Sequence, residues 1–316
     1  MAAVALVTCL AAPYTHAQTT YPTQTIKIIV PNPPGGLPDT LTRIVGQRLQ
    51  ERLGQPVVIE NRSGASSGIG TAAMTSAPAD GYTFLVTDGA ILSINPLLYT
   101  KLPYDPKEVL PVAFIARAPL FLATNANVPV ANMKGLIDYA KANPGKLNYG
   151  SIGVGSFHHL SMEALNAALG LQMNHIPYKG SGETIGALLG GHIDLVFAAY
   201  AGLRSAVETK KVKVLATNGG QRSPQEPDIP SVAEFAPGLD LAVIQGILAR
   251  VGTSPAVVEK IAGEIAAIVK EPEIIRQFAI SGSEPVGSGP AEYAAALARE
   301  AERMAKIVNA AGLKPQ

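Results

Sequence analysis

The sequence has one cysteine, no tryptophan and little charge, and each shortage excludes a class of protein. Because Cys9 stands alone, the chain can form neither an internal disulfide framework nor a cysteine-rich metal site. Lys and Arg number 25 and Asp and Glu 24, which gives a formal net charge of +1 and excludes electrostatic recruitment to nucleic acid or to an anionic membrane. After the first residues, no stretch is long and apolar enough to span a membrane. The 316 residues, 47% of them hydrophobic, fit one large or two moderate globular domains.

The first residues resemble an export signal. Ala2 to Ala12 is an apolar run of signal-peptide length, and Thr15-His16-Ala17 is a small-x-small cleavage site. We therefore expect residues 1–17 to be a signal peptide cleaved near Ala17, and the mature protein to be periplasmic. The basic residues that usually precede the apolar run are missing, so the true start of the signal peptide stays open. Cleavage would also remove Cys9, which suits an oxidising compartment.

Strand-like and helix-like patterns alternate along the rest of the chain, which implies sheets with helical crossovers. Helices are expected from Asp39, from a cap at Ser156 and from a cap at Ser254, with a last one from Pro290 to Val308. Strands are expected at residues 25–30, 57–60, 83–86, 147–150, 175–177, 193–197, 212–216 and 242–248.

The order of these segments predicts an α/β protein with two lobes, because one unit is entered near Phe121 and left near Leu241. Lobe 1 is expected to hold residues 24–121 together with 245–316, and lobe 2 residues 122–244. Each lobe would be a mixed, mostly parallel sheet flanked by helices. Two crossover segments would form a hinge and place a cleft between the lobes. We expect a monomer.

Two glycine-rich loops are the first candidates for a binding site, because each joins a strand to the start of a helix. One is Pro33-Pro34-Gly35-Gly36 with Asp39 beyond it, and the other is Ser151-Ile152-Gly153-Val154-Gly155-Ser156, followed by His159. Glycines let the backbone approach a ligand, and a helix start adds unpaired N–H groups and a partial positive charge. Each loop alone can also be an ordinary turn with a helix cap, but together they predict a clamp for an anion.

Other features are weaker evidence for a ligand contact, a metal site or an active site. Asp88-Gly89 follows the third expected strand, where ligands of α/β sheets bind, although Asp88 can equally cap the next helix. His159 and Glu163 are four residues apart but lack a third metal ligand, so neither a metal nor another cofactor is expected. Because no His-Glu-x-x-His motif occurs and the Ser, His and Asp residues follow no recognisable catalytic order, no catalytic residues are expected and an enzyme is the weakest interpretation.

The chain resembles the tripartite tricarboxylate transporter substrate-binding family, the Bug-type receptors, over nearly the whole mature sequence. The matching segments are Ile29-Val30-Pro31 with Pro33 to Gly36 and Asp39, Leu53 to Val58, Glu60-Asn61-Arg62, Asp80 to Thr83, Ile94-Asn95-Pro96, Leu102 to Asp105, Ala142 to Leu147, Pro177 to Gly180 and Glu284 to Ser288. The resemblance implies a type II periplasmic-binding-protein fold that closes on a small organic acid held by the two loops.

Several positions depart from the usual pattern of that family. Asn32 alters an apolar wall of the expected cleft, Asp88 adds a carboxylate, and Ala198, with Tyr200 nearby, stands where a carboxylate is usual. The other departures are Ile91, Leu92, Ile244 and Gln245. The lost carboxylate at Ala198 argues against an amino acid as ligand, and Asp88 would oppose a second carboxylate. The candidate ligand-binding residues are therefore Asn32, Pro34, Gly35, Gly36, Asp39, Asp88, Gly89, Ser151, Gly153, Gly155, Ser156, His159, Ala198, Tyr200 and Gln245.

The resemblance implies a receptor that hands its ligand to membrane transporter subunits. The alternative is a periplasmic sensor that binds the same ligand but docks a sensor kinase. The identity of the carboxylate stays open.

Overall fold

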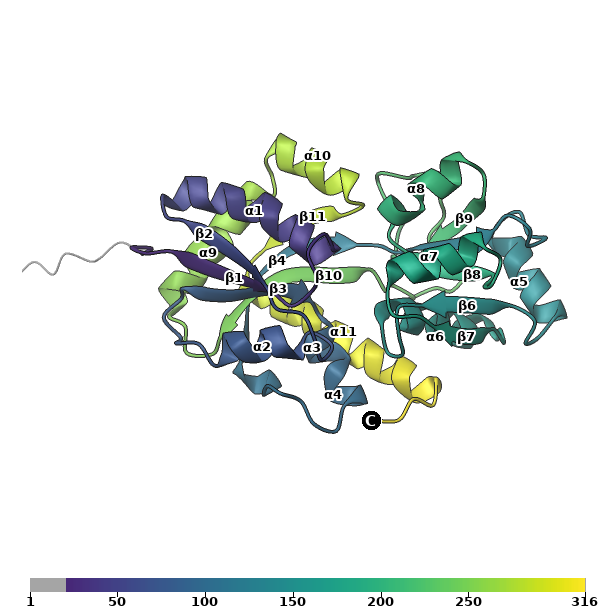
Figure 1. Ribbon diagram of the computed structural model, residues 1–316, viewed down its shortest axis with the longest axis horizontal. Coiled ribbons are helices and arrows are strands. Elements are labelled where there is room, and N and C mark those ends of the chain that lie inside the picture. The colour runs from purple at the N-terminus through teal and green to yellow at the C-terminus, as the bar shows by residue number, and fades with distance from the viewer. Residues whose placement is uncertain (1–20, 316) are drawn as a thin grey trace, which may run out of the picture.

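The computed structural model describes residues 21–315 and consists of two α/β lobes side by side (Figure 1). The predicted signal peptide, residues 1–17, lies outside the described residues. Within residues 21–315, no helix combines the length and apolar character needed to cross a membrane.

The first lobe is built on a six-stranded sheet in the order β11-β4-β10-β3-β1-β2. Helices α1, α9 and α10 cover one face of it, and α2, α3 and α11 cover the other. The strands are β1 (Ile26–Val30), β2 (Val57–Asn61), β3 (Thr83–Asp88), β4 (Val109–Ala118), β10 (Val243–Arg250) and β11 (Glu284–Ser288). The helices are α1 (Leu37–Leu53), α2 (Gly68–Thr75), α3 (Ala90–Ser93), α4 (Asn95–Leu98), α9 (Pro255–Ile268), α10 (Pro272–Ile280) and α11 (Pro290–Ala310).

The second lobe is built on a five-stranded sheet in the order β7-β6-β8-β5-β9, between helices α5 and α6 on one face and α7 and α8 on the other. Its strands are β5 (Phe121–Asn125), β6 (Asn148–Ser151), β7 (Asn174–Pro177), β8 (Leu195–Ala198) and β9 (Val212–Thr217). Its helices are α5 (Met133–Ala142), α6 (Phe157–Leu169), α7 (Ser181–Leu189) and α8 (Tyr200–Glu208). The alternation of strands and helices in the sequence predicted this architecture.

The expectation of mostly parallel sheets is wrong in detail. Four neighbouring strand pairs are parallel and five are antiparallel. The antiparallel pairs all involve β4, β5, β9, β10 or β11. Strands β5 and β10, with which the chain enters each lobe from the other, run against both of their neighbours, and β11 runs against β4.

The predicted helix starts are confirmed except at Asp39. Ser156 and Ser254 cap α6 and α9, and Pro290 begins α11. Helix α1 begins two residues before Asp39, at Leu37, with Gly36 as its N-cap. Because Pro38 stands in the first turn, where its missing N–H costs nothing, the helix can start before the residue that looked like its cap.

Two chain segments pass between the lobes side by side, and Asn218 joins them. Its side-chain oxygen accepts from the Leu120 N–H at 2.8 Å, and its Nδ2 donates to the Leu241 carbonyl at 2.8 Å and to Ser161 Oγ at 3.0 Å. Its backbone also exchanges hydrogen bonds with Leu120 and Leu241. Beside this buried clip, Arg117 donates to both carboxylate oxygens of Asp240, at 2.6 and 2.7 Å.

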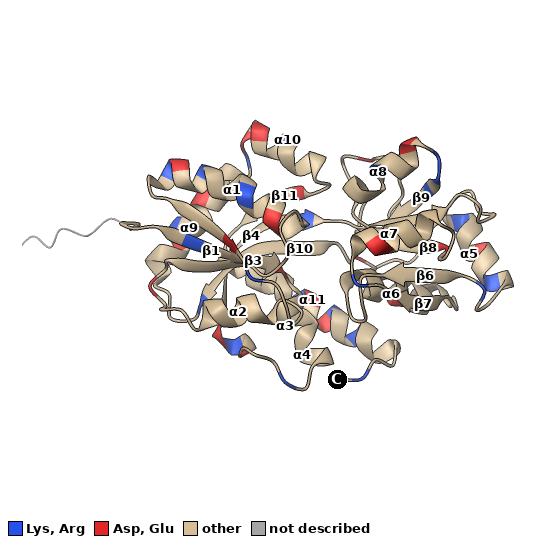
Figure 2. Ribbon diagram, in the orientation of Figure 1, with Lys and Arg blue, Asp and Glu red and all other residues tan. Residues whose placement is uncertain are grey.

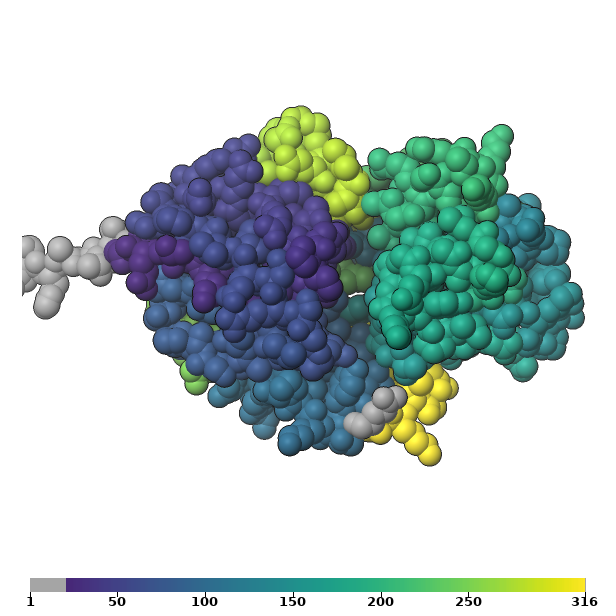
Figure 3. Space-filling view, in the orientation of Figure 1, coloured from purple at the N-terminus to yellow at the C-terminus, as the bar shows by residue number. Residues whose placement is uncertain are grey.

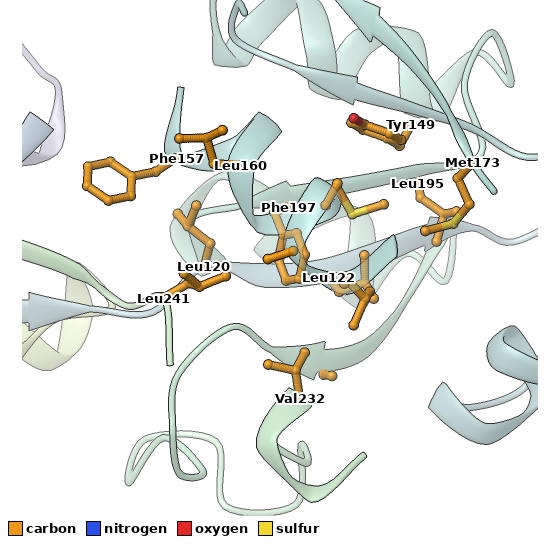
Figure 4. Packing of buried hydrophobic residues seen from close by; sticks show 14 of the residues in the cluster. Leu120, Leu122, Tyr149, Phe157, Leu160, Met173, Leu195, Phe197, Val232 and Leu241 are labelled. Carbon is orange, nitrogen blue, oxygen red and sulfur yellow. The ribbon is translucent and has the colours of Figure 1, made fainter. Parts of the chain in front are cut away.

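Helix α11 forms a third link between the two sheets. Its first half packs on the first sheet through Tyr293 and Leu297, whereas Met304, Ile307 and Val308 belong to the apolar cluster of the second lobe. That cluster contains Leu160, Phe197 and Leu241 among its buried members (Figure 4). The predicted division, which places all of residues 245–316 in lobe 1, stays a prediction, and this helix contributes buried residues to both cores.

We expect Asn218→Ala to lower the free energy of unfolding by about 2 to 4 kcal/mol, because it leaves the Leu120 N–H, the Leu241 carbonyl and Ser161 without partners in a dry site. Urea unfolding followed by circular dichroism measures this change. Asn309→Ala, at an exposed position of α11, is the control and is expected to change stability by no more than about 0.5 kcal/mol. Equal stabilities of the two variants would contradict the role of Asn218.

We expect the stability of the protein to fall as the pH rises from about 4 to about 8, in part because of Glu300. This side chain is fully buried in α11 and accepts from Ser93 Oγ at 2.7 Å. Burial, helped by the nearby Asp88, raises the pKa of Glu300 to about 8, so the folded protein keeps a proton that the unfolded chain releases above about pH 4. Glu300→Gln is expected to flatten this slope in melting experiments at a series of pH values. Glu302→Gln, on the exposed side of the same helix, should leave the slope intact.

Candidate ligand-binding site

The carboxyl ends of the parallel strands in the two sheets face each other. Ala118, at the end of β4, pairs with Val243, and three residues later β5 begins at Phe121, which pairs with Ala198 at the end of β8. In the first sheet the end of β3 lies at this same edge, since Asp88 pairs with Gln245 near the start of β10. Loops that follow β1, β3, β6 and β8 therefore meet between the lobes, where Figure 3 shows a hollow.

The first glycine-rich loop lies at this edge with its backbone exposed. Residues Pro33 to Gly36 follow β1 and are all exposed, and Gly35 has φ +84°, a conformation that favours glycine. Gly36 is the N-cap of α1, and no side chain caps the helix there. The start of a 17-residue helix is therefore open to a ligand, with unpaired backbone N–H groups and the positive end of the helix dipole.

Asp39, a candidate ligand contact, is engaged inside the protein. Its carboxylate accepts from Gly35 N at 2.9 Å, from Asn61 Nδ2 at 2.9 Å and from two nitrogens of Arg43 at 2.9 and 3.0 Å. Burial opposes its ionisation, but these hydrogen bonds outweigh burial and hold the pKa of Asp39 below its usual value. Asp39 thus holds the glycine loop in place, and Arg43 compensates its negative charge, which weakens its repulsion of an anion.

The second glycine-rich loop is held together by its own hydrogen bonds. Ser151 Oγ lies 3.1 Å from Gly153 N and 2.7 Å from His175 Nε2, and Ser156 Oγ donates to the Gly153 carbonyl at 2.7 Å and accepts from His159 N. Both serine hydroxyls, which the sequence offered as ligand contacts, therefore have partners within the protein. A ligand at this loop would meet mainly backbone groups.

Three stacked rings lie beside the second loop, and two of them form hydrogen bonds with it. The rings of His159 and His175 lie 3.8 Å apart, and that of Tyr149 lies 5.1 Å from His175. Gly155 N donates to His159 Nδ1 at 3.0 Å, so this nitrogen carries no proton. Burial lowers the pKa of both histidines to about 4, which keeps them neutral at physiological pH. The stack therefore fixes the loop without placing a charge under it.

Contact with the first lobe also fixes this loop. Gly155 has φ +78°, and a Cβ atom at its position would lie 2.1 Å from the Leu98 side chain in α4. Both the close approach and the positive φ favour glycine here. Leu98 of α4 therefore contacts the second loop, although α4 was not among the predicted site residues.

Asp88, Gly89 and Gln245 lie together at the end of β3 and the start of β10. Asp88 Oδ1 accepts from Ala90 N at 3.1 Å, and burial raises the pKa of Asp88 to about 6. Gly89 packs so closely on Glu300 that a Cβ atom there would lie 2.0 Å from its carboxyl oxygen. Gln245 is 2% exposed, and its Oε1 has no hydrogen-bond partner, as is also true of Asn32 Oδ1.

Ala198 and Tyr200 lie at the carboxyl end of β8. Ala198 is buried against Phe121, and the Tyr200 ring packs on Phe121 with centroids 4.8 Å apart. Tyr200 also lies near Gly282 of the first lobe, where a Cβ atom would come within 3.9 Å of the Tyr200 Cβ. These two residues form the part of the edge beside α10.

The charged and metal-ligating side chains are spread over the described part of the chain (Figure 2). Among residues 21–315, no three His, Cys, Asp or Glu side chains are arranged to hold a metal ion. Glu163, the suggested partner of His159, instead accepts from the Tyr149 hydroxyl. Basic and acidic residues are interspersed over both lobes (Figure 2).

Sequence reasoning missed the residues that hold the site in place. Asn61 lies within the family-matching segment Glu60-Asn61-Arg62, yet nothing in the sequence connects it with Asp39. His175 was assigned only to a strand, and no local pattern joins it to His159. Both are partly buried polar residues of strands, which is no distinguishing signal in the sequence.

Comparison with known proteins agrees with this arrangement. The family model described as "Tripartite tricarboxylate transporter family receptor" matches residues 41–313. The protein BugT of Bordetella pertussis is 33% identical over 298 residues, which are 93% of this chain and 91% of BugT.

Solved structures show the same fold. The R. palustris protein Rpa4515, solved with adipate, is 32% identical with a TM-score of 0.84 over 94% of this chain and 100% of its own. MatC from Rhodopseudomonas palustris, solved with bound malate, is 26% identical with a TM-score of 0.76 over 91% of this chain and 100% of its own. The two-lobe periplasmic-binding-protein fold is therefore confirmed, and the chain belongs to the tripartite tricarboxylate transporter receptor family, a family of periplasmic solute-binding receptors rather than enzymes.

Proposed function

We propose that this protein captures a small organic acid in the periplasm, between the loops Pro33 to Gly36 and Ser151 to Ser156, and delivers it to a membrane transporter. The acid would lie between the carboxyl ends of the two sheets. Its carboxylate would receive hydrogen bonds from backbone N–H groups, above all at the start of α1.

The observation that carries this proposal is the open start of α1. Gly36 leaves the first turn without a side-chain cap, although most helix starts are capped by a Ser, Thr, Asp or Asn side chain. The one carboxylate in that turn, Asp39, is paired with Arg43 and turned into the protein. A helix start with a compensated acid and exposed glycines is suited to an anion and to little else.

Relatives support the ligand class. Rpa4515 and MatC, which share the fold along almost their whole length, were solved with adipate and with malate, both small carboxylates. Transfer to membrane subunits follows the family description.

We expect at least one small carboxylate to raise the melting temperature of the purified protein, since a ligand that binds only the folded form stabilises it. A fluorescence melting screen against mono-, di- and hydroxycarboxylates with one to ten carbon atoms measures this, and calorimetric titration gives the affinity of each hit. Neutral amides of the same acids are the controls and are expected to have no effect. A folded protein that responds to no acid in the panel would contradict the proposed function.

We expect Gly36→Val to weaken binding of any acid found in that screen by at least about tenfold, equivalent to about 1.4 kcal/mol. Gly36 has φ −71°, and a Cβ atom there would make only ordinary contacts, so a side chain is compatible with the fold but occupies the ligand's place at the helix start.

Gly289→Val is the matched control. Gly289 is also an N-cap glycine without a side-chain cap, and its helix, α11, also has a proline in its first turn. A Cβ atom there would meet no neighbour within 4 Å. The control is expected to keep full affinity, and unchanged affinity in Gly36→Val as well would remove the first loop from the site.

A further inference from the structure

Three polar residues lie at the edge of the first sheet that faces lobe 2, and we call them the row. Gln245 of β10 pairs directly with Asp88 of β3, and directly opposite residues of paired strands lie about 5 Å apart. Asn32 lies two residues beyond the end of β1, which also pairs with β3, so it follows the same edge.

Two side-chain oxygens of this row lack a hydrogen-bond partner. Asn32 Oδ1 and Gln245 Oε1 are both buried and have no hydrogen-bond partner. Only 2% of Gln245 is exposed. A buried oxygen without a partner costs about 1 to 3 kcal/mol. Rotation of either amide toward a ligand would break no existing bond of that oxygen, and a donor on the ligand would relieve the cost.

Asp88 determines which ligand group this row accepts. Its Oδ1 accepts the Ala90 N–H, and with a pKa raised by burial to about 6 it is largely ionised at neutral pH. No Lys or Arg takes part in the hydrogen bond of Asp88, in contrast to Asp39, which Arg43 compensates. A free carboxylate at the row would therefore meet an uncompensated negative charge, whereas a hydroxyl or ammonium group would meet acceptors.

We propose that Asn32, Asp88 and Gln245 form an acceptor subsite, and that the ligand is an organic acid whose other end carries a hydrogen-bond donor, a hydroxyl or ammonium group, rather than a second free carboxylate. The inference rests on the proposed function. The glycine loops hold the carboxylate, and the row selects the opposite end.

The direct test is calorimetric titration at pH 7.5 with three series of unbranched acids of matched length: ω-hydroxyalkanoates, ω-aminoalkanoates and α,ω-dicarboxylates. At the chain length that binds best, a donor-ended acid is expected to bind at least about tenfold more tightly than the dicarboxylate. The hydroxy and amino series show which donor the row prefers.

Asp88→Asn tests the charge itself. It keeps the size and the acceptor oxygen, and it is expected to reduce the preference for the donor-ended acid to less than about threefold, chiefly by improved binding of the dicarboxylate. Asp80→Asn is the matched control: Asp80 stands just before β3, and its carboxylate also accepts the N–H two residues further on, that of Tyr82. This control is expected to leave the preference unchanged.

Gln245→Leu is a second test of the subsite, and it does not depend on the folding of the Asp88 variant. Since Gln245 Oε1 has no protein partner, its loss breaks no hydrogen bond made by that oxygen. The variant is expected to lose about tenfold in affinity for the donor-ended acid and less than about twofold for the unsubstituted alkanoate of equal length.

The possible failures are distinguishable. If acids bind but dicarboxylates bind as tightly as donor-ended acids, or if Asp88→Asn leaves the preference intact, the acceptor subsite is wrong and the receptor function stands. If the protein is folded and no acid of these series or of the wider panel binds, the receptor function itself is wrong.

Discussion

The antiparallel ladder between β4 and β10 is the constraint on which the arrangement of the molecule depends. Its pairs run from Val243↔Ala118 to Arg250↔Val109, so the strand that leaves lobe 1 and the strand that returns lie side by side. Both crossings therefore leave the sheet at one edge, which is the edge where β1 and β3 end. The proposed ligand site lies between the facing strand ends that this pairing brings about, and Asn218 keeps the two crossings together beyond the end of the ladder.

The proposed site would select an anion with little net charge. A positive side chain at each loop would bind an anion strongly, but it would also need compensation when the site is empty. Here backbone N–H groups provide the positive potential, Arg43 forms an ion pair with Asp39, and the two histidines beside the second loop are neutral. Such a site is consistent with a chain whose formal net charge is only +1, and it leaves specificity to the residues around the loops.

The sequence predicted the parts of this structure that depend on local pattern. The β-branched runs that became β1, β2, β3 and β9, the caps at Ser156 and Ser254 and the two glycine loops could all be read from neighbours in the chain. Strand β4 was missed because Pro111 interrupts it, and β11 because Pro285 and Gly287 do. The partners of Asp39, of His159 and of Gly89 could not be predicted, since Asn61, His175 and Glu300 lie 22, 16 and 211 residues away and only the folded chain brings them together.

Helix α11 limits how the two lobes can move relative to each other. On the side of α4 and α6 the lobes share one apolar cluster, to which Leu98, Phe157 and Met304 all contribute. On the opposite side, the contact between the α10–β11 turn and the second lobe includes a hydrogen bond from Gln225 to the Ser283 carbonyl at 3.3 Å. Separation on the first side would expose buried apolar surface at about 25 cal/mol per Å², whereas the Gln225 bond can be exchanged for water. Separation of the lobes is therefore costlier on the apolar side than on the side of α10 and α8.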